Sequence, residues 1–220
     1  MLIAALLTPT ALAWEVMTVP GTDIEVAWYQ TPIPYDIAED EVLDDDSVEA
    51  VRASFERWSS VRGADVAFRG GQSVRRPGEA AMDDAQLVFV DHDWPYDDDV
   101  LALAATWADE GTGEMVHFDL RLNGHLDWGT DGHPDDYDLG TAVTHEIGHV
   151  LGLDHTDEVD AVMFAALEPG VVRSRLHDDD REALRYLYGA DARPFACQSV
   201  GGSAGWLALS SMLLLWRRQR

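Results

Sequence analysis

The sequence has no lysine, a single cysteine and no apolar run long enough to cross a bilayer as a helix. All 15 basic residues are therefore arginines, and they face 41 acidic residues, for a formal net charge of −26. This balance argues against nucleic acid as a partner, because binding a phosphate backbone needs clustered positive charge. It argues equally against adsorption of the folded part to an anionic membrane. A lone cysteine excludes an internal disulfide framework and a cysteine-rich zinc module.

The sequence does contain enough apolar residues for a buried core. The hydrophobic fraction is 46%, with eight Trp, six Tyr and six Phe, which excludes general disorder. A length of 220 residues suits one domain of ordinary size. We expect that domain at residues 14–195, where 12 arginines against all 41 acidic residues give a formal charge of −29. Such a charge favours solubility, and it attracts basic substrates.

The two ends of the chain differ from this central segment. Residues 1–13 carry no charge and end in Ala11-Leu12-Ala13, the small-x-small pattern that signal peptidase cleaves, so we predict a signal peptide there. The alternative is a buried N-terminal strand. Residues 196–220 contain Cys197, an uncharged run at Ala204–Trp216 and a final group of arginines. This order resembles the cysteine-containing C-terminal sorting tails of myxobacterial surface proteins, and the resemblance implies processing near the cysteine and anchoring at the cell surface. The alternative is an amphipathic or buried terminal helix.

Hydrophobic periodicity predicts a domain with both strands and helices. Alternation and short apolar runs predict strands at residues 14–29, 66–68, 87–90, 101–107 and 115–122, and Pro32 and Pro34 are expected to end the first of them. Apolar residues at spacings of three and four predict a helix that begins with a capping box of Asp46 and Glu49 and stops at Gly63. Gly70-Gly71 and residues 124–138 are expected in loops. Strand, helix, several strands and then helices indicate an α+β or mixed α/β sandwich.

The segment 141–155 reads TAVTHEIGHVLGLDH and carries the chemistry. His145 and His149 are four residues apart, so on a helix they project from one face and can bind one Zn²⁺. Glu146 lies next to that face and can act as a base, because zinc brings the pKa of bound water to about 7. Gly152 lets the chain leave the helix in a left-handed conformation and return His155 as a third ligand. Three protein ligands leave a coordination position open, as in catalytic zinc sites.

The full spacing H-E-x-x-H-x-x-G-x-x-H resembles the metzincin metalloendopeptidases, and Met163, eight residues past His155, resembles their Met-turn. Asp179 and Asp180, followed by Leu187-Tyr188-Gly189, resemble the last helix of matrixins. The segment His117-Phe118-Asp119 resembles the strand before their zinc helix. The resemblance implies a bacterial matrixin-type catalytic domain with a twisted mixed sheet, an active-site zinc helix, and a substrate cleft along the edge strand.

Several departures from the matrixin pattern limit what the resemblance implies. The expected mature chain leaves no room for a propeptide whose cysteine caps the zinc, so we expect no such latency. Leu101-Ala102-Leu103-Ala104 replaces a ligand histidine, so we expect no structural zinc, although His92, Asp93 and His117 remain as partial ligands. The Met-turn continues in Phe164-Ala165-Ala166, which leaves the specificity of the adjoining pocket open.

The other acidic and histidine clusters carry weaker signals. The aspartates at 97–99 and between 127 and 138 are candidates for Ca²⁺, but a solvated acidic surface is the preferred interpretation. We expect His125, His133 and His177 to be surface histidines, since none has a partner at a ligand spacing.

The leading functional hypothesis is a secreted or surface-anchored zinc endopeptidase that acts on protein or peptide substrates as a monomer and touches a membrane only through its tail. His145, His149 and His155 would bind the zinc, and Glu146 would be the base. The first alternative is a zinc-binding surface or adhesion module without proteolysis, which would have no need of the base. The second is a metallohydrolase that acts on something other than peptide.

Overall fold

The computed structural model describes residues 13–75, 85–97, 99–190 and 192, and the backbone of residues 206–212. Its strands are β1 (Ile33–Ala38), β2 (Phe68–Val74), β3 (Leu87–Asp91), β4 (Ala102–Asp109), β5 (Met115–Asn123), β6 (Trp128–Gly129), β7 (Tyr137–Asp138) and β8 (Trp206–Met212). Its helices are α1 (Asp45–Ser59), α2 (Leu139–Val150) and α3 (Asp178–Tyr188). None of the described helices is long and apolar enough to span a membrane.

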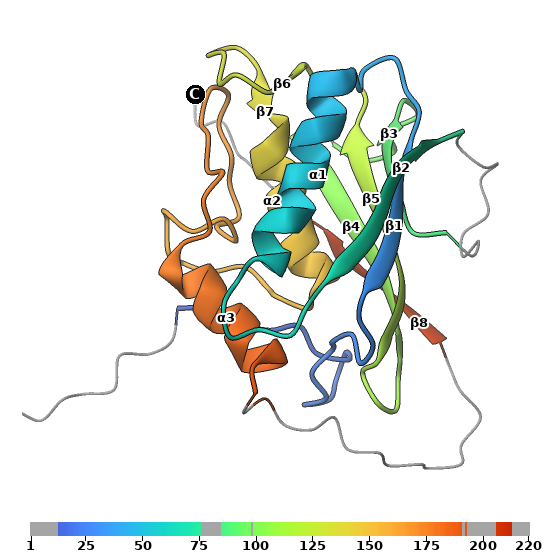
Figure 1. The fold of residues 1–220 in the computed structure, drawn as a ribbon, viewed down its shortest axis with the longest axis vertical. Helices are drawn as coiled ribbons and strands as arrows, with labels where there is room; N and C mark the ends of the chain where they lie inside the picture. Colours follow the sequence, from blue (N-terminus) through green and yellow to red (C-terminus); the bar gives the residue numbers. More distant parts are fainter. Residues whose placement is uncertain (1–12, 76–84, 98, 191, 193–205, 213–220) are drawn as a thin grey trace, which may run out of the picture.

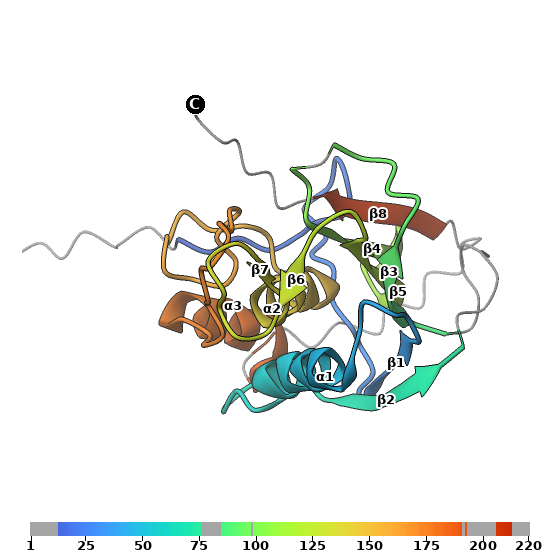
Figure 2. The same ribbon diagram turned by 90° about the horizontal axis from the view of Figure 1, so that it is seen from above.

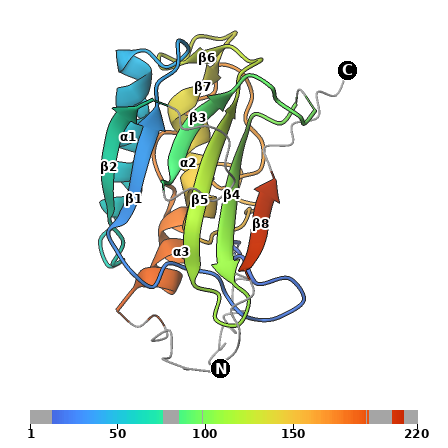
Figure 3. The ribbon, with the colours of Figure 1, turned by 90° about the vertical axis from the view of Figure 1, so that its right-hand side faces the viewer.

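One mixed sheet in the order β2-β1-β3-β5-β4-β8 forms a single layer, whose strands are seen side by side in Figure 3. Strands β2, β1, β3 and β5 are mutually parallel, and β4 runs antiparallel to β5. All three helices lie on the same side of this sheet, with α1 and α2 next to it and α3 beyond α2 (Figure 1, Figure 2). This arrangement confirms the predicted α+β class with a mixed sheet.

The first strand is the main error of the sequence analysis. Residues 14–29 form only isolated bridges, because the chain turns at Pro20-Gly21 and folds back so that Val26 N donates to Met17 O at 3.0 Å. The first strand is β1 instead, although it contains Pro34. The missing N–H of Pro34 does no harm, because pairing with β3 begins only at Asp36. Proline therefore did not end a strand here but stands at the start of one.

Helix α1 forms where its apolar spacing predicted it, with different ends. Its N-cap is Asp44, whose side chain accepts a hydrogen bond from Ser47 N, so the predicted capping box of Asp46 and Glu49 is wrong. The helix ends at Ser59 rather than at Gly63. Phe55 and Trp58 on its inner face are fully buried, and the Trp58 indole donates to Thr144 O on α2 at 2.8 Å. This bond ties the two helices together in the core.

The two edge strands also differ from expectation. Gly70-Gly71 lies inside β2 and not in a loop, and Gly70 accompanies a bulge in the β1–β2 pairing where a Cβ would meet Tyr35 O at 2.1 Å. At the other edge, β8 pairs antiparallel with β4. The alternative of a terminal helix is therefore wrong over residues 206–212. The remaining part of the predicted tail and residues 1–12 of the predicted signal peptide lie outside the described residues.

Candidate metal centre

Helix α2 is buried along its whole length, and it packs beside α1 on the sheet, where it contacts β4 and β5. Its N-cap is Asp138, whose carboxylate accepts hydrogen bonds from Thr141 N at 2.7 Å and from Thr141 Oγ1 at 2.5 Å. The cap satisfies backbone donors that the first turn leaves unpaired. A buried, capped helix is a rigid platform for His145 and His149, whose exposed fractions are only 1%.

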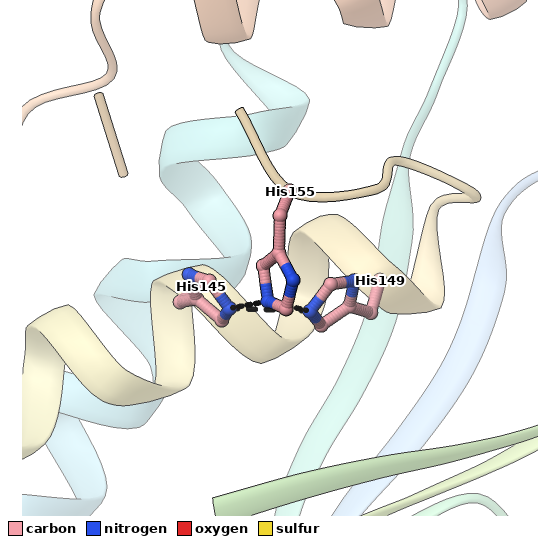
Figure 4. Close-up of side chains that lie close together, drawn as sticks. All are labelled: His145, His149 and His155. Atoms are coloured by element: carbon pink, nitrogen blue, oxygen red, sulfur yellow. Dashed lines mark hydrogen bonds between the residues drawn. The ribbon is translucent and has the colours of Figure 1, made fainter. Parts of the chain in front are cut away.

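The structure brings the three predicted ligands together (Figure 4). The Nε2 atoms of His145 and His149 are 3.1 Å apart, and they lie 3.2 and 3.3 Å from Nε2 of His155. His155 comes from the loop after α2 and points back at the helix, so its ring stands between the other two. Among the described residues, this is the only group of three or more His, Cys, Asp or Glu side chains that could share an ion.

The protons of the two helix histidines are placed away from this centre. Nδ1 of His145 lies 2.7 Å from Val162 O, and Nδ1 of His149 lies 2.8 Å from Leu153 O. A carbonyl oxygen only accepts, so each Nδ1 carries the proton and each Nε2 keeps a lone pair directed at the centre. Burial and the neighbouring His155 lower the pKa of His149 to about 4, which keeps that ring neutral at physiological pH.

The geometry fits zinc. A tetrahedral ion with Zn–N bonds of 2.0–2.1 Å places its nitrogen ligands about 3.3–3.4 Å apart. The three Nε2 separations of 3.1–3.3 Å are equal to or slightly shorter than this distance. Lone pairs of neutral imidazoles that face one another at this distance repel, so the arrangement is favourable only around a cation. Three imidazole nitrogens suit Zn²⁺ and not the oxygen-binding Ca²⁺.

The predicted turn at Gly152 returns His155 to the helix. Gly152 has φ +89°, the left-handed conformation that favours glycine, and a Cβ there would meet Val26 O at 2.2 Å. Its N–H donates to His149 O, and the next N–H, of Leu153, donates to Gly148 O. The helix therefore ends at the point where the chain must reverse, as the sequence analysis predicted.

Glu146 is completely buried beside the three histidines. Burial raises the pKa of Glu146 well above its usual value, and the backbone N–H of Ala104 on β4 offsets part of that rise. The Ala104 N–H therefore lies close enough to act on the carboxylate, although by distance and angle neither Glu146 oxygen has a hydrogen-bond partner among the described residues. A buried carboxylate without partners is costly, so a group bound at this centre, such as water, is expected to donate hydrogen bonds to it.

Met163 lies beneath the zinc helix. Its side chain is 2% exposed, and a Cβ on Gly148 would meet Met163 Sδ at 2.2 Å. A glycine at position 148 is therefore what allows the methionine to pack against α2 next to His149. The backbone of the same turn holds the ligands, because Val162 O accepts from His145 and Met163 O accepts from Thr156 N, one residue past His155.

The comparisons with known proteins match this arrangement of fold and site. The family model described as Matrixin matches residues 27–189, which include both zinc helix and Met-turn. The chain belongs to the matrixin family. It is 28% identical to Metalloendoproteinase 1 of Glycine max over 72% of this chain and 51% of that protein. It is 29% identical to Metalloendoproteinase 1-MMP of Arabidopsis thaliana over 76% of this chain and 45% of that protein. A shorter match is to Matrix metalloproteinase-2 of Drosophila melanogaster, with 40% identity over 39% of this chain and 11% of that protein. The chain thus spans about half the length, or less, of these relatives.

Asp180, which the sequence predicted only to stand at the start of a helix, holds the Met-turn of this matrixin site in place. Asp180 is fully buried, and its carboxylate accepts three backbone N–H bonds, from Val162 and Met163 at 3.0 Å and from His177 at 2.6 Å. Burial raises the pKa of Asp180, and these three donors offset part of the rise. The carboxylate joins α3 to the Met-turn. Its partners lie 17 and 18 positions earlier in the chain, so hydrophobic periodicity could not predict the contact.

The remaining histidines of this matrixin lie outside the metal centre. His125 and His133 are exposed, as expected, whereas His177 is the N-cap of α3 and accepts a hydrogen bond from Asp179 N at 3.3 Å. His177 is thus not a simple surface histidine. His117 is 5% exposed on β5, 3.6 Å from Asp119, and packs edge-on against Trp107. Residue 98 lies outside the described residues, so at the aspartates of 97–99 both the candidate Ca²⁺ site and the solvated acidic surface preferred over it stay predictions.

Proposed function

We propose that this matrixin is a zinc-dependent endopeptidase in which Glu146 acts as the general base. The observation that carries the proposal is the buried carboxylate of Glu146, whose two oxygens have no hydrogen-bond partner among the described residues, on the same helix as His145 and His149, whose imidazole nitrogens converge with that of His155. Zinc held by His145, His149 and His155 would act as a Lewis acid on the scissile carbonyl and make water more acidic.

The chain's own residues then supply the proton transfers. The Glu146 carboxylate accepts a proton from water as the water oxygen bonds to the carbonyl carbon. The same carboxyl group gives the proton to the amide nitrogen as the C–N bond breaks, which leaves a free carboxyl and a free amino end. The Nδ1 bonds of His145 and His149 to backbone carbonyls keep both rings oriented during these steps.

The names of the relatives support peptides as the substrate. Two are called metalloendoproteinases and one a matrix metalloproteinase. This favours peptide hydrolysis over a metallohydrolase with another substrate. A zinc-binding surface or adhesion module stays as the alternative, and activity decides between them.

The decisive experiment is cleavage of an unfolded protein with and without a chelator. Glu146→Ala should lower the cleavage rate by about 10²–10⁴-fold while zinc content stays at that of the wild type. Glu182→Gln, which changes an exposed carboxylate on α3, is the matched control and should cleave normally. Full activity in Glu146→Ala refutes the base, and chelator-resistant cleavage refutes the zinc. A zinc-loaded wild type without any cleavage supports the adhesion module.

The same proposal places the enzyme outside the cell. Cleavage after Ala13 would release the domain, and residues 196–220 would attach a monomer to the surface of a bacterium, its only contact with a membrane. The support is the pattern of the two terminal segments alone. Mass spectrometry of the protein from intact, fractionated cells tests it: Met1 and Arg220 on one exported chain would refute both processing steps. Size-exclusion chromatography checks the monomer.

A further inference from the structure

A cavity of about 480 Å³ is lined by the end of α1 and the residues just after it, by the loop before α3, and by α3. Five arginines line it: Arg57 from α1, Arg62 just after that helix, Arg175 from the loop before α3, and Arg181 and Arg185 from α3. The cavity, here called the arginine cavity, shares none of its lining residues with the metal centre. Its volume is in the range of small-molecule sites.

The positive charge of the arginine cavity is mostly uncompensated. A third of the chain's 15 basic residues gather here, although the chain carries 41 acidic residues and none of them lines the cavity. Only Arg181 has an ion-pair partner among the described residues, at 2.8 Å from Asp178. The exposed guanidinium groups of Arg62 and Arg175 make no ion pair or hydrogen bond within the described part of the chain.

Two of the five arginines have a structural role. Arg57 donates to Ser54 Oγ and Thr144 Oγ1, and burial lowers its pKa. Arg185 donates through Nε to Arg62 O. The hydrogen-bond partners are neutral, but the Asp138 carboxylate also acts on Arg57, so the positive charges that line the cavity without an acidic partner among the described residues are those of Arg62, Arg175 and Arg185. Solvation explains a single exposed arginine, but it does not explain why arginines from three separate segments converge in an acidic protein.

We propose that the arginine cavity binds a ligand through a phosphate or sulfate group. Guanidinium groups match the oxygens of such groups with paired hydrogen bonds, and they stay charged at every physiological pH. The hydroxyl group of Ser174 adds a neutral donor at the same wall. The volume exceeds that of one oxyanion, so the ligand is a phosphorylated or sulfated molecule of about the size of a sugar, either free or as the end unit of a polymer.

Calorimetric titration of the full, zinc-loaded chain tests the proposal. The probes are glucose 6-phosphate, glucose 6-sulfate and inorganic phosphate, with free glucose as the neutral probe and ionic strength held constant with chloride. We expect saturable one-site binding of the charged probes and none of glucose. Arg62→Gln and Arg175→Gln should each weaken binding about tenfold, because each removes a charge-assisted contact without a partner inside the protein.

The controls separate this site from the zinc. Arg69→Gln changes an exposed arginine on β2, away from the cavity, and should leave binding unchanged. Glu146→Ala should also bind the probes normally. Absence of saturable binding, or binding that survives the Arg62→Gln/Arg175→Gln double variant with an unchanged melting temperature, overturns the proposal. None of these outcomes depends on peptide cleavage.

A second inference follows independently from the pairing of β8. The strand lies antiparallel along the outer edge of β4, from Met212 opposite Leu103 to Trp206 opposite Asp109. The same strand β4 borders the metal centre, since the Ala104 N–H approaches Glu146. An extended peptide bound along this edge, as the sequence analysis expects, would need the backbone groups that β8 occupies.

We infer that β8, in the chain whose tail is not yet processed and anchored, is an internal inhibitor that competes with substrate for the edge of β4, a regulation that rests on the proposed endopeptidase function. If β8 stays paired most of the time, only the molecules with a free β4 edge can bind peptide. The apparent affinity for peptide is then the intrinsic affinity multiplied by the fraction of such molecules. Displacement of β8 should therefore lower KM and leave kcat unchanged, because it adds no group to the chemistry.

The test uses the full chain with the double substitution Leu209→Pro/Ser210→Pro. Of two adjacent residues in β8, one directs its N–H at β4, and proline at both positions removes that N–H whichever residue carries it. Leu209→Ala/Ser210→Ala keeps both N–H groups and is the control. We expect faster hydrogen exchange in β4 and KM lower by about tenfold, with the control like the wild type. An unchanged KM despite faster exchange overturns the inference. In the Glu146→Ala background, tighter binding of uncleaved peptide supports it even if the proposed catalysis fails.

Discussion

Replacement of Asp180 by Asn tests whether α3 holds the metal centre through the Met-turn. The carboxylate accepts from three backbone N–H groups: Oδ1 from Met163, and Oδ2 from both Val162 and His177. An Asn side chain has the same shape but only one accepting oxygen. In its better orientation the amide oxygen keeps the two bonds of Oδ2, and its NH₂ group faces the Met163 N–H.

The cost follows from that orientation. At least one hydrogen bond to a charged acceptor is lost, which is worth about 1.5–3 kcal/mol, and two donors face each other in a fully buried site. We expect Asp180→Asn to lower the free energy of unfolding in urea by about 2–3 kcal/mol. Because Val162 O accepts from His145 Nδ1, a displaced turn should also weaken zinc binding by about tenfold.

The neighbouring residue provides the control. Asp178→Asn removes an exposed carboxylate from the same helical turn, where it pairs with Arg181, and should change stability by less than about 1 kcal/mol. Urea denaturation of the zinc-free proteins gives the stabilities, and competition with a zinc indicator gives the affinities. If Asp180→Asn unfolds like Asp178→Asn and binds zinc like the wild type, the assignment of Asp180 as a positioning residue is wrong.

Three further perturbations address the same centre. Gly152→Ala should lower the free energy of unfolding by at least about 2 kcal/mol and weaken zinc binding, because φ is +89° and the Cβ would meet a carbonyl oxygen at 2.2 Å. Its control is Gly21→Ala, at φ +77° with open space around the Cβ, which should lower it by only about 1 kcal/mol in the same urea assay. Gly148→Ala should cost about 1–3 kcal/mol by displacing the Met-turn sulfur, whereas Gly140→Ala on the same helix, with its nearest contact at 3.6 Å, should raise stability by up to about 1 kcal/mol. Zinc at a free concentration of 100 times its Kd should add about 2.7 kcal/mol, a rise in melting temperature of about 5–10 °C by calorimetry, and a chelator should reverse it. Equal melting temperatures with and without zinc would exclude the three histidines as a zinc site.

The sequence predicted best what one local segment encodes. The spacing of His145, His149, Gly152 and His155 depends on a single helix and the turn after it, so its geometry could be inferred without knowing what packs around it. The amphipathic face of α1 was predictable for the same reason. The ends of α1 were less so, because several aspartates compete for the cap and only the final geometry selects Asp44.

Features that depend on distant contacts could not be inferred in this way. Proline at position 34 indicated the end of a strand, and only the register of β3, which starts opposite Asp36, makes it harmless. The five arginines of the arginine cavity are spread over more than 120 residues and have no common spacing. The pairing of β8 with β4 joins segments about 100 residues apart, and an uncharged run gives no sign of its partner.

These two classes of feature meet at the metal centre, where the motif alone is insufficient. The helix fixes two ligands, but the third depends on Gly152, where the backbone of Val26 leaves no room for a side chain. The tautomer of His145 depends on Val162 O, and the position of that turn depends on Asp180 from α3. A chain with the same H-E-x-x-H-x-x-G-x-x-H segment but without the buried aspartate would keep its ligands and lose their orientation. Metal affinity should therefore respond to α3, although no residue of α3 touches the metal-binding nitrogens.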